Sequence, residues 1–218
     1  MAQKVGVLLS GCGYLDGAEI HESVCTLLAL DEAGAEAVCM APDVTLDVVD
    51  HITGEPTGEQ RNVLAESARI ARGQIQDVTA VDVSSLDALI LPGGFGAAKN
   101  LSDFASEGSG MTVRPEVEQL IKAVHEAGKP IGAICIAPAV ISKLLPGVSL
   151  TIGNDVSTSR TLEAMGSIHC ECPVDEFTVD AENKVVSTPA YMLGPWIKDV
   201  NTGIARCVAE VLGMIDAG

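Results

Sequence analysis

Cys135 stands where a strand-like apolar run meets a helical pattern. The run is Ile131–Ile134, and Pro138 opens the helical residues that follow it. A strand that turns sharply into a helix holds its turning residue at the carboxyl edge of a sheet, as in a nucleophile elbow. Because a helix N-terminus favours negative charge, we expect the Cys135 thiol to lose its proton readily. The alternative is an ordinary buried thiol, since free cysteine is among the most buried residue types.

A glycine-rich turn, residues 92–96 (PGGFG), follows a second apolar run at residues 86–91. This turn should lie beside the elbow at the same edge of the sheet. Gly93 and Gly94 are adjacent, so their backbone N–H groups can face a bound oxygen, as in an oxyanion hole. The turn lacks the P-loop lysine and the dinucleotide-binding spacing, which argues against a nucleotide site. A tight turn without a ligand is the alternative.

Glu22 lies about one turn into the first predicted helix, residues 18–33. If the first strand and the elbow strand are neighbours, Glu22 points at Cys135, where a carboxyl can hold or move a proton. Pattern alone favours a solvated helix residue at Glu22 over a site residue, and His21 beside it is ambiguous in the same way.

Residues 169–172 (HCEC) contain side-chain types that bind metals. Alternate residues of a strand point to opposite faces, so only part of this segment could bind one ion, and no second pair follows at structural-zinc spacing. We therefore predict no metal site.

Strand-like runs and helical patterns alternate along the chain. A helix that ends at Gly34 separates apolar runs at residues 5–9 and 35–40, and the helix–glycine–strand pattern recurs. Such alternation predicts an α/β fold with right-handed crossovers. We also predict a strand pair at residues 174–179 and 184–187, a helix at 160–165 and a final helix at 195–214.

Residues 43–80 look like an elaboration of this fold, on the surface or over a cleft. Thr57 and Gln60 have the spacing of a capping box, which predicts a helix from Thr57 to Gly73. We expect residues 1–218 to form a single domain that includes this elaboration.

Composition limits the class of protein. Hydrophobic residues make up 47% of the 218 residues but aromatic residues only 3%, which suits a parallel sheet between helices. The net charge of −17 argues against binding nucleic acid or anionic membranes. Seven cysteines without a disulfide-framework spacing indicate a reducing compartment, and we expect a cytoplasmic protein. No apolar segment is long enough to span a membrane.

Four spaced motifs together resemble the ThiJ/PfpI superfamily, a branch of the class I glutamine-amidotransferase-like fold. They are residues 17–22 (GAEIHE), 92–96 with Lys99 and Asn100, 133–138 (AICIAP) and 187–192 (STPAYM). The resemblance covers nearly the whole chain and implies a flavodoxin-like three-layer sandwich with a mostly parallel central sheet and helices on both faces.

The resemblance also implies a cofactor-free glyoxalase. It assigns the nucleophile to Cys135, the carboxyl that hydrogen-bonds it to Glu22, and the oxyanion pocket to Gly93, Gly94 and the N–H of Ile136. The sequence departs from many members in one place, because Asn154 and Asp155 stand where those members have a histidine. A Cys–His pair would then be absent, which weakens a hydrolase or glutaminase function and predicts slow turnover.

We therefore expect a homodimeric glyoxalase that converts methylglyoxal or glyoxal to lactate or glycolate, with a link to isoprenoid biosynthesis. Its partner would be a small dicarbonyl substrate, and it would need no cofactor and no metal. The alternative is a low-turnover redox-sensing or partner-binding protein that uses the same cysteine, since exposed cysteines of low pKa oxidise easily.

Overall fold

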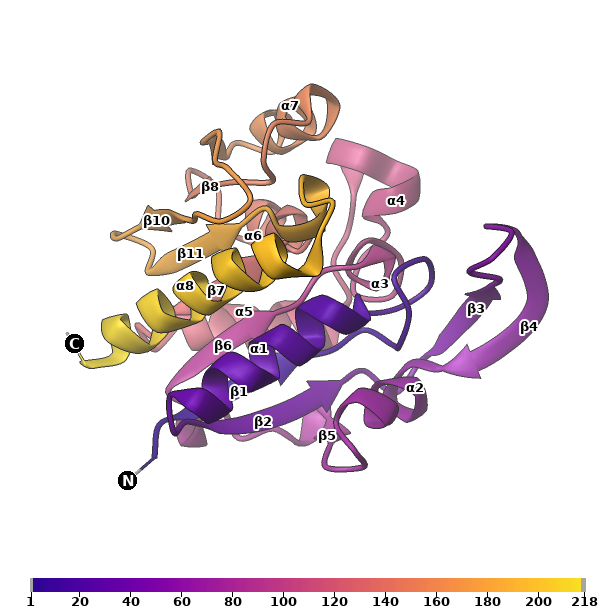
Figure 1. Ribbon diagram of the computed structural model, residues 1–218, viewed down its shortest axis with the longest axis horizontal. Helices are drawn as coiled ribbons and strands as arrows, with labels where there is room; N and C mark the ends of the chain where they lie inside the picture. The colour runs from indigo at the N-terminus through magenta and orange to yellow at the C-terminus, as the bar shows by residue number, and fades with distance from the viewer. Residues whose placement is uncertain (1, 217–218) are drawn as a thin grey trace.

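A seven-stranded sheet runs through the protein in the order β10-β11-β7-β6-β1-β2-β5 (Figure 1). The computed structural model describes residues 2–216, so the ends of the predicted 1–218 unit lie outside the described residues. The strands are parallel except β10, which pairs antiparallel with β11. The predicted α/β fold with a mostly parallel central sheet is confirmed.

The strands of this sheet are β1 (Lys4–Leu8), β2 (Glu36–Ala41), β5 (Gln76–Asp77), β6 (Ala88–Leu91), β7 (Ile131–Ile134), β10 (Thr178–Asp180) and β11 (Val185–Thr188). Two small sheets are formed by β3 (Thr45–Val49) with β4 (Pro56–Asn62) and by β8 (Ser149–Leu150) with β9 (Ile168–His169). The helices are α1 (Ile20–Glu32), α2 (Val63–Ile70), α3 (Phe95–Lys99), α4 (Phe104–Glu107), α5 (Pro115–Glu126), α6 (Pro138–Leu144), α7 (Val156–Ala164) and α8 (Ile197–Asp216), with short 3₁₀ turns η1 (Val78–Ala80), η2 (Val83–Ser85), η3 (Gly108–Gly110) and η4 (Ala190–Met192).

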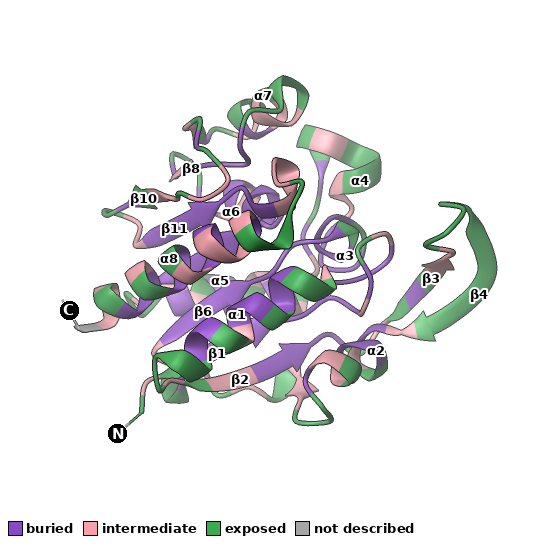
Figure 2. Cartoon of the chain, viewed as in Figure 1, coloured by how far each residue is buried: buried purple, intermediate pink, exposed green. Residues whose placement is uncertain are grey.

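Strand β6 shows how the sheet forms the middle of three layers. Its alternate residues Ala88 and Ile90 pack with residues of α1 and α8, whereas Leu89 and Leu91 pack with residues of α5 and α6. All four residues are buried, and Figure 2 shows the central strands buried between helices that are exposed on their outer sides. A strand covered on both faces needs apolar residues at every position, which explains the unbroken apolar runs in the sequence.

The predicted strand pair near the C-terminus is present as the β10–β11 hairpin, and the final helix α8 begins at Ile197. Helix α7 starts at Val156, four residues before its predicted start, because the Asp155 side chain caps it.

The capping-box prediction at Thr57 is wrong. Residues 56–62 form strand β4, which pairs antiparallel with β3, and this hairpin projects from the body (Figure 1). The helix begins only at Val63, where the Asn62 side chain accepts a hydrogen bond from the N–H of Ala65 at 2.8 Å. A capping box is a local pattern, and here pairing with β3 overrides it.

The condition under which Glu22 was considered to point at Cys135, that β1 and β7 are neighbours, is not met, because β6 lies between them. The side chain of Glu22 therefore has to pass the end of β6 to meet Cys135.

Candidate active site

Cys135 occupies the elbow between β7 and α6, as predicted. Its φ is +61°, in the left-handed region that residues with a side chain rarely adopt. Its N–H donates to the carbonyl of Thr188 at 2.9 Å, which ties the turn to the end of neighbouring strand β11. Strain held in this way by surrounding structure is typical of functional sites. Cys135 is 7% exposed, and it faces a cavity.

Glu22 lies in the first turn of α1 and has no exposed surface. One carboxyl oxygen accepts the N–H of Gly93 at 2.9 Å, and the other accepts the N–H of Tyr191 at 3.2 Å. The carboxyl also lies beside the Cys135 thiol, and each of the two groups shifts the pKa of the other. The Glu19 side chain caps α1 by accepting the N–H of Glu22 at 2.7 Å. Two backbone N–H groups thus hold the buried carboxyl beside the sulfur, and Glu19 holds the backbone of Glu22.

Gly93 explains how Glu22 reaches Cys135 across β6. A Cβ at position 93 would lie 2.4 Å from the Cys135 Cβ and 2.7 Å from a carboxyl oxygen of Glu22, so no other residue fits without displacing one of them. Its N–H donates to Glu22, whereas the N–H groups of Gly94 and Ile136 face the sulfur and act to lower the pKa of the thiol. The structure thus brings all five predicted site residues together. The N–H of Gly93 contacts the Glu22 carboxyl, and the N–H groups of Gly94 and Ile136 face the Cys135 thiol.

The two ionisable groups of this pair both favour their protonated forms. Burial, with a smaller contribution from Glu19, raises the pKa of Glu22 to about 8. Burial and the nearby Glu22 raise the pKa of the Cys135 thiol well above its ordinary value, although the N–H groups of Gly94 and Ile136 act in the opposite direction. The prediction that the helix end lowers the thiol pKa is therefore wrong, because desolvation and the neighbouring carboxyl outweigh the backbone dipoles.

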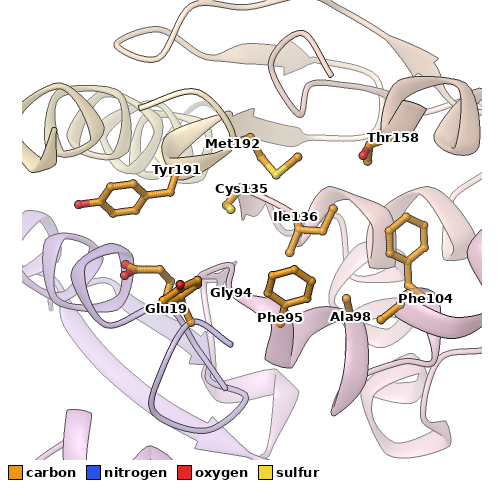
Figure 3. Close-up of a pocket in the computed structure, with 12 residues that line it drawn as sticks. Glu19, Gly94, Phe95, Ala98, Phe104, Cys135, Ile136, Thr158, Tyr191 and Met192 are labelled. Atoms are coloured by element: carbon orange, nitrogen blue, oxygen red, sulfur yellow. The ribbon is translucent and has the colours of Figure 1, made fainter. Parts of the chain in front are cut away.

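A cavity of about 410 Å³ opens onto the sulfur. Figure 3 shows Glu19 and Tyr191 on one side of Cys135 and Phe104 and Thr158 on the other. The full lining comprises Tyr14, Glu19, Gly94, Phe95, Ala98, Phe104, Ala105, Cys135, Ile136, Thr158, Tyr191 and Met192. The cavity gives a small molecule access to the thiol while the carboxyl behind it stays dry.

Tyr191 was not among the predicted site residues. It lies in η4 just after Ala190, whose φ of +45° is also in the left-handed region, and this bend aims the N–H of Tyr191 at Glu22. Its hydroxyl is 2.7 Å from Nδ1 of His21. Residues 187–192 were one of the four motifs, so the sequence did contain a signal there, but it did not indicate a backbone contact.

Residues Asn154 and Asp155, which replace the histidine of many superfamily members, do not supply a base. The Asp155 carboxylate caps α7 by accepting the N–H of Thr158 at 2.7 Å, and Thr158 lines the cavity. No histidine is among the described residues that line it. His169 instead lies 3.4 Å from the N–H of Ile152, outside the cavity lining.

Within residues 2–216, no three His, Cys, Asp or Glu side chains are grouped so that they could hold a metal ion. The same part of the chain contains no helix with the length and apolar character needed to cross a membrane.

The elbow, the buried carboxyl and the three-layer sandwich define a class of protein, and comparison with family models agrees. Residues 12–188 match the model of the DJ-1/PfpI family. The chain belongs to this family, which confirms the predicted resemblance.

Individual relatives extend the match. The human "Glutamine amidotransferase-like class 1 domain-containing protein 3, mitochondrial" is 47% identical over 97% of this chain and 83% of its own. A solved structure described as an isoprenoid biosynthesis protein with amidotransferase-like domain, from Ehrlichia chaffeensis, is 38% identical with a TM-score of 0.92, over 98% of this chain and 99% of that chain. Glyoxalase III from Candida albicans is 12% identical with a TM-score of 0.66, over 99% and 98% of the two chains, a likeness of fold.

Proposed function

We propose that the protein is a cofactor-independent glyoxalase that converts small 2-oxoaldehydes to 2-hydroxy acids. The observation that carries this proposal is the buried pair of Cys135 and Glu22 at the base of a cavity. A thiol can capture an aldehyde, and a carboxyl whose pKa is near neutrality can move a proton in both directions.

In the first step the Cys135 sulfur adds to the aldehyde carbon of R–CO–CHO, and the aldehyde oxygen takes up the proton that the thiol loses. The product is a hemithioacetal. The N–H groups of Gly94 and Ile136, which face the sulfur in the free protein, would stabilise negative charge on the aldehyde oxygen as it forms.

In the second step the carboxylate form of Glu22 removes the hydrogen of the former aldehyde carbon and returns a proton to the adjacent carbon through an enediol. One carbon is oxidised to a thioester and the other is reduced to an alcohol, so no external oxidant or reductant is needed. Water then breaks the C–S bond, which releases the 2-hydroxy acid and returns a proton to sulfur. Because the pKa of Glu22 is about 8, its base form grows as the pH approaches 8 and turnover should rise with it.

The alternative of a redox-sensing or partner-binding protein is weaker in this geometry. A sensor cysteine is typically exposed with a lowered pKa, whereas Cys135 is buried and its pKa is raised. The name of the human relative suggests a glutaminase function for that protein. In this chain the described residues of the cavity include no histidine that could pair with the cysteine for such a reaction.

The experiment that tests the proposal is conversion of methylglyoxal to lactate by the parent protein, Cys135→Ala and the matched control Cys12→Ala. Cys12 is half-buried and does not line the cavity. We expect Cys135→Ala to abolish lactate formation and Cys12→Ala to retain it. Equal conversion by Cys135→Ala and the parent rules the proposal out.

We also propose that the protein is a homodimer joined through α1. Ile20, Val24 and Leu28 recur every four residues along α1 and are 42%, 50% and 46% exposed. Trp196 and Ile197 are exposed at the start of α8, the helix that packs beside α1 (Figure 1). An exposed apolar surface of this kind usually marks an interaction site.

A reducing, cytoplasmic location remains part of the proposal and is supported by seven free cysteines.

A further inference from the structure

The cavity at Cys135 is much larger than a three-carbon dicarbonyl requires. Its volume is about 410 Å³, whereas a dry apolar cavity of about 150 Å³ is enough to bind benzene in another protein. Methylglyoxal held at the sulfur would therefore leave most of this space to water.

The surplus space is apolar. On the side of Cys135 away from Glu19 and Tyr191, the lining consists mainly of Phe95, Ala98, Phe104 and Ile136, as Figure 3 shows. Water in such a space finds few hydrogen-bond partners, so displacing it with an apolar group is favourable. This side of the cavity thus selects an apolar substituent.

The charge of the lining disfavours anionic ligands. Glu19 is the charged side chain among the described lining residues, which include no lysine, arginine or histidine. A carboxylate or phosphate on the ligand would find no cationic side chain in the lining itself, and the net charge of −17 repels it further. Lys99 lies behind this lining, with its Nζ 5.1 Å from the centroid of the Phe95 ring.

From these observations we infer that the substrate is an uncharged 2-oxoaldehyde whose ketone carries an aromatic or branched apolar group of about benzene size. This inference rests on the proposed function. The aldehyde carbon lies at the Cys135 sulfur, and the apolar group lies among Phe95, Phe104 and Ile136. The chemistry is unchanged: phenylglyoxal and water give mandelate, with one carbon oxidised and its neighbour reduced.

The first test compares kcat/KM for phenylglyoxal and methylglyoxal. We expect phenylglyoxal to be preferred by at least about tenfold, as filling an apolar pocket typically allows. Ala98→Leu fills part of the apolar side, and we expect it to lower the phenylglyoxal value at least about tenfold more than the methylglyoxal value. The matched control is Ala181→Leu, because Ala181 is exposed in the turn between β10 and β11. If Ala98→Leu does not fold, Phe104→Ala removes an aromatic wall and should likewise reduce the preference.

The second test needs no turnover and separates the inference from the proposed function. Acetophenone and acetone have no aldehyde to consume, and their binding to the parent and to Ala98→Leu can be compared by saturation-transfer NMR. We expect acetophenone to bind the parent and to lose binding in Ala98→Leu, with acetone silent in both. If acetophenone binds in this way but the protein converts no dicarbonyl, the proposed glyoxalase function is ruled out, whereas the preference of the cavity for an apolar group stands. Equal signals for the two ketones, or methylglyoxal preferred by the parent, overturns the inference.

Discussion

Glu22 is a carboxyl that folding removes from water, so its contribution to stability depends on pH. Its pKa is about 8 in the folded protein, against an ordinary value of 4.5. The native state therefore keeps a proton that the unfolded chain releases between these values. The stability that this proton contributes is fully present below pH 4.5 and is lost as the pH rises through about 8.

Replacing Glu22 by glutamine removes this titration. We expect the stability of Glu22→Gln relative to the parent to increase from pH 5 to pH 8 by a few kcal/mol, on the order of 1.4 kcal/mol per pH unit. Urea unfolding at several pH values measures the difference, and any fixed cost of the lost hydrogen bond cancels from its slope. Glu32→Gln, at the exposed end of the same helix, is the matched control and should change stability by less than about 0.5 kcal/mol throughout. A relative stability of Glu22→Gln that does not change with pH contradicts the raised pKa.

Gly93 is needed for the space beside Cys135, not for an unusual backbone conformation. We expect Gly93→Ala to lose about 1–3 kcal/mol of stability, since its methyl group would overlap Cys135 and Glu22. Gly110→Ala is the matched control because a Cβ there meets nothing within 4 Å. Thermal unfolding of both variants measures the effect, and equal melting temperatures would show that the site can absorb the methyl group.

At the residue scale the strand-to-helix pattern placed Cys135 at an elbow, whereas Glu22 was placed beside it by the family resemblance, because pattern alone favoured a solvated helix residue there. The sequence could not give their pKa values, since burial is a property of the assembled site. Nor could it give the contact of Tyr191, which depends on the left-handed backbone of Ala190.

At the scale of elements, the strands and helices around the sheet follow from unbroken apolar runs and glycine stops, and these were predicted well. The β3–β4 hairpin was missed because residues 56–62 are polar and exposed and have no alternation of apolar residues to mark a strand. The order of the strands was not predictable either, since nothing local places β6 between β1 and β7.

The corrected start of α2 makes a prediction. Asn62→Ala should cost about 1 kcal/mol, because it removes the side-chain cap of the Ala65 N–H. Thr57→Ala should cost less than Asn62→Ala, because the hydrogen bonds of Thr57, to the Val48 carbonyl and from the Glu59 N–H, are exposed to water on strand β4. Chemical denaturation of the two variants measures which residue caps α2. A larger loss of stability in Thr57→Ala than in Asn62→Ala would indicate that the helix starts at Thr57.

At the scale of the whole molecule, the exposed apolar residues of α1, Ile20, Val24 and Leu28, stand out in a chain with a net charge of −17. A charge placed in a buried interface is costly. If α1 forms the proposed dimer interface, Val24→Glu should shift the protein from dimer to monomer in light scattering after size exclusion. Ile52→Glu is the matched control, because Ile52 is 96% exposed at the tip of the β3–β4 hairpin. A monomer produced by Ile52→Glu and not by Val24→Glu would assign the interface to the hairpin.

The most direct test of the account separates capture of the aldehyde from movement of the proton. Glu22→Gln retains the Cys135 thiol but has no carboxyl to act as base, so methylglyoxal labelled with ¹³C should accumulate on it as a hemithioacetal. The account predicts a ¹³C signal from this adduct, its loss in the double variant with Cys135→Ala, and little lactate from either. Lactate formed by Glu22→Gln at the rate of the parent, or an adduct that persists without Cys135, would contradict it.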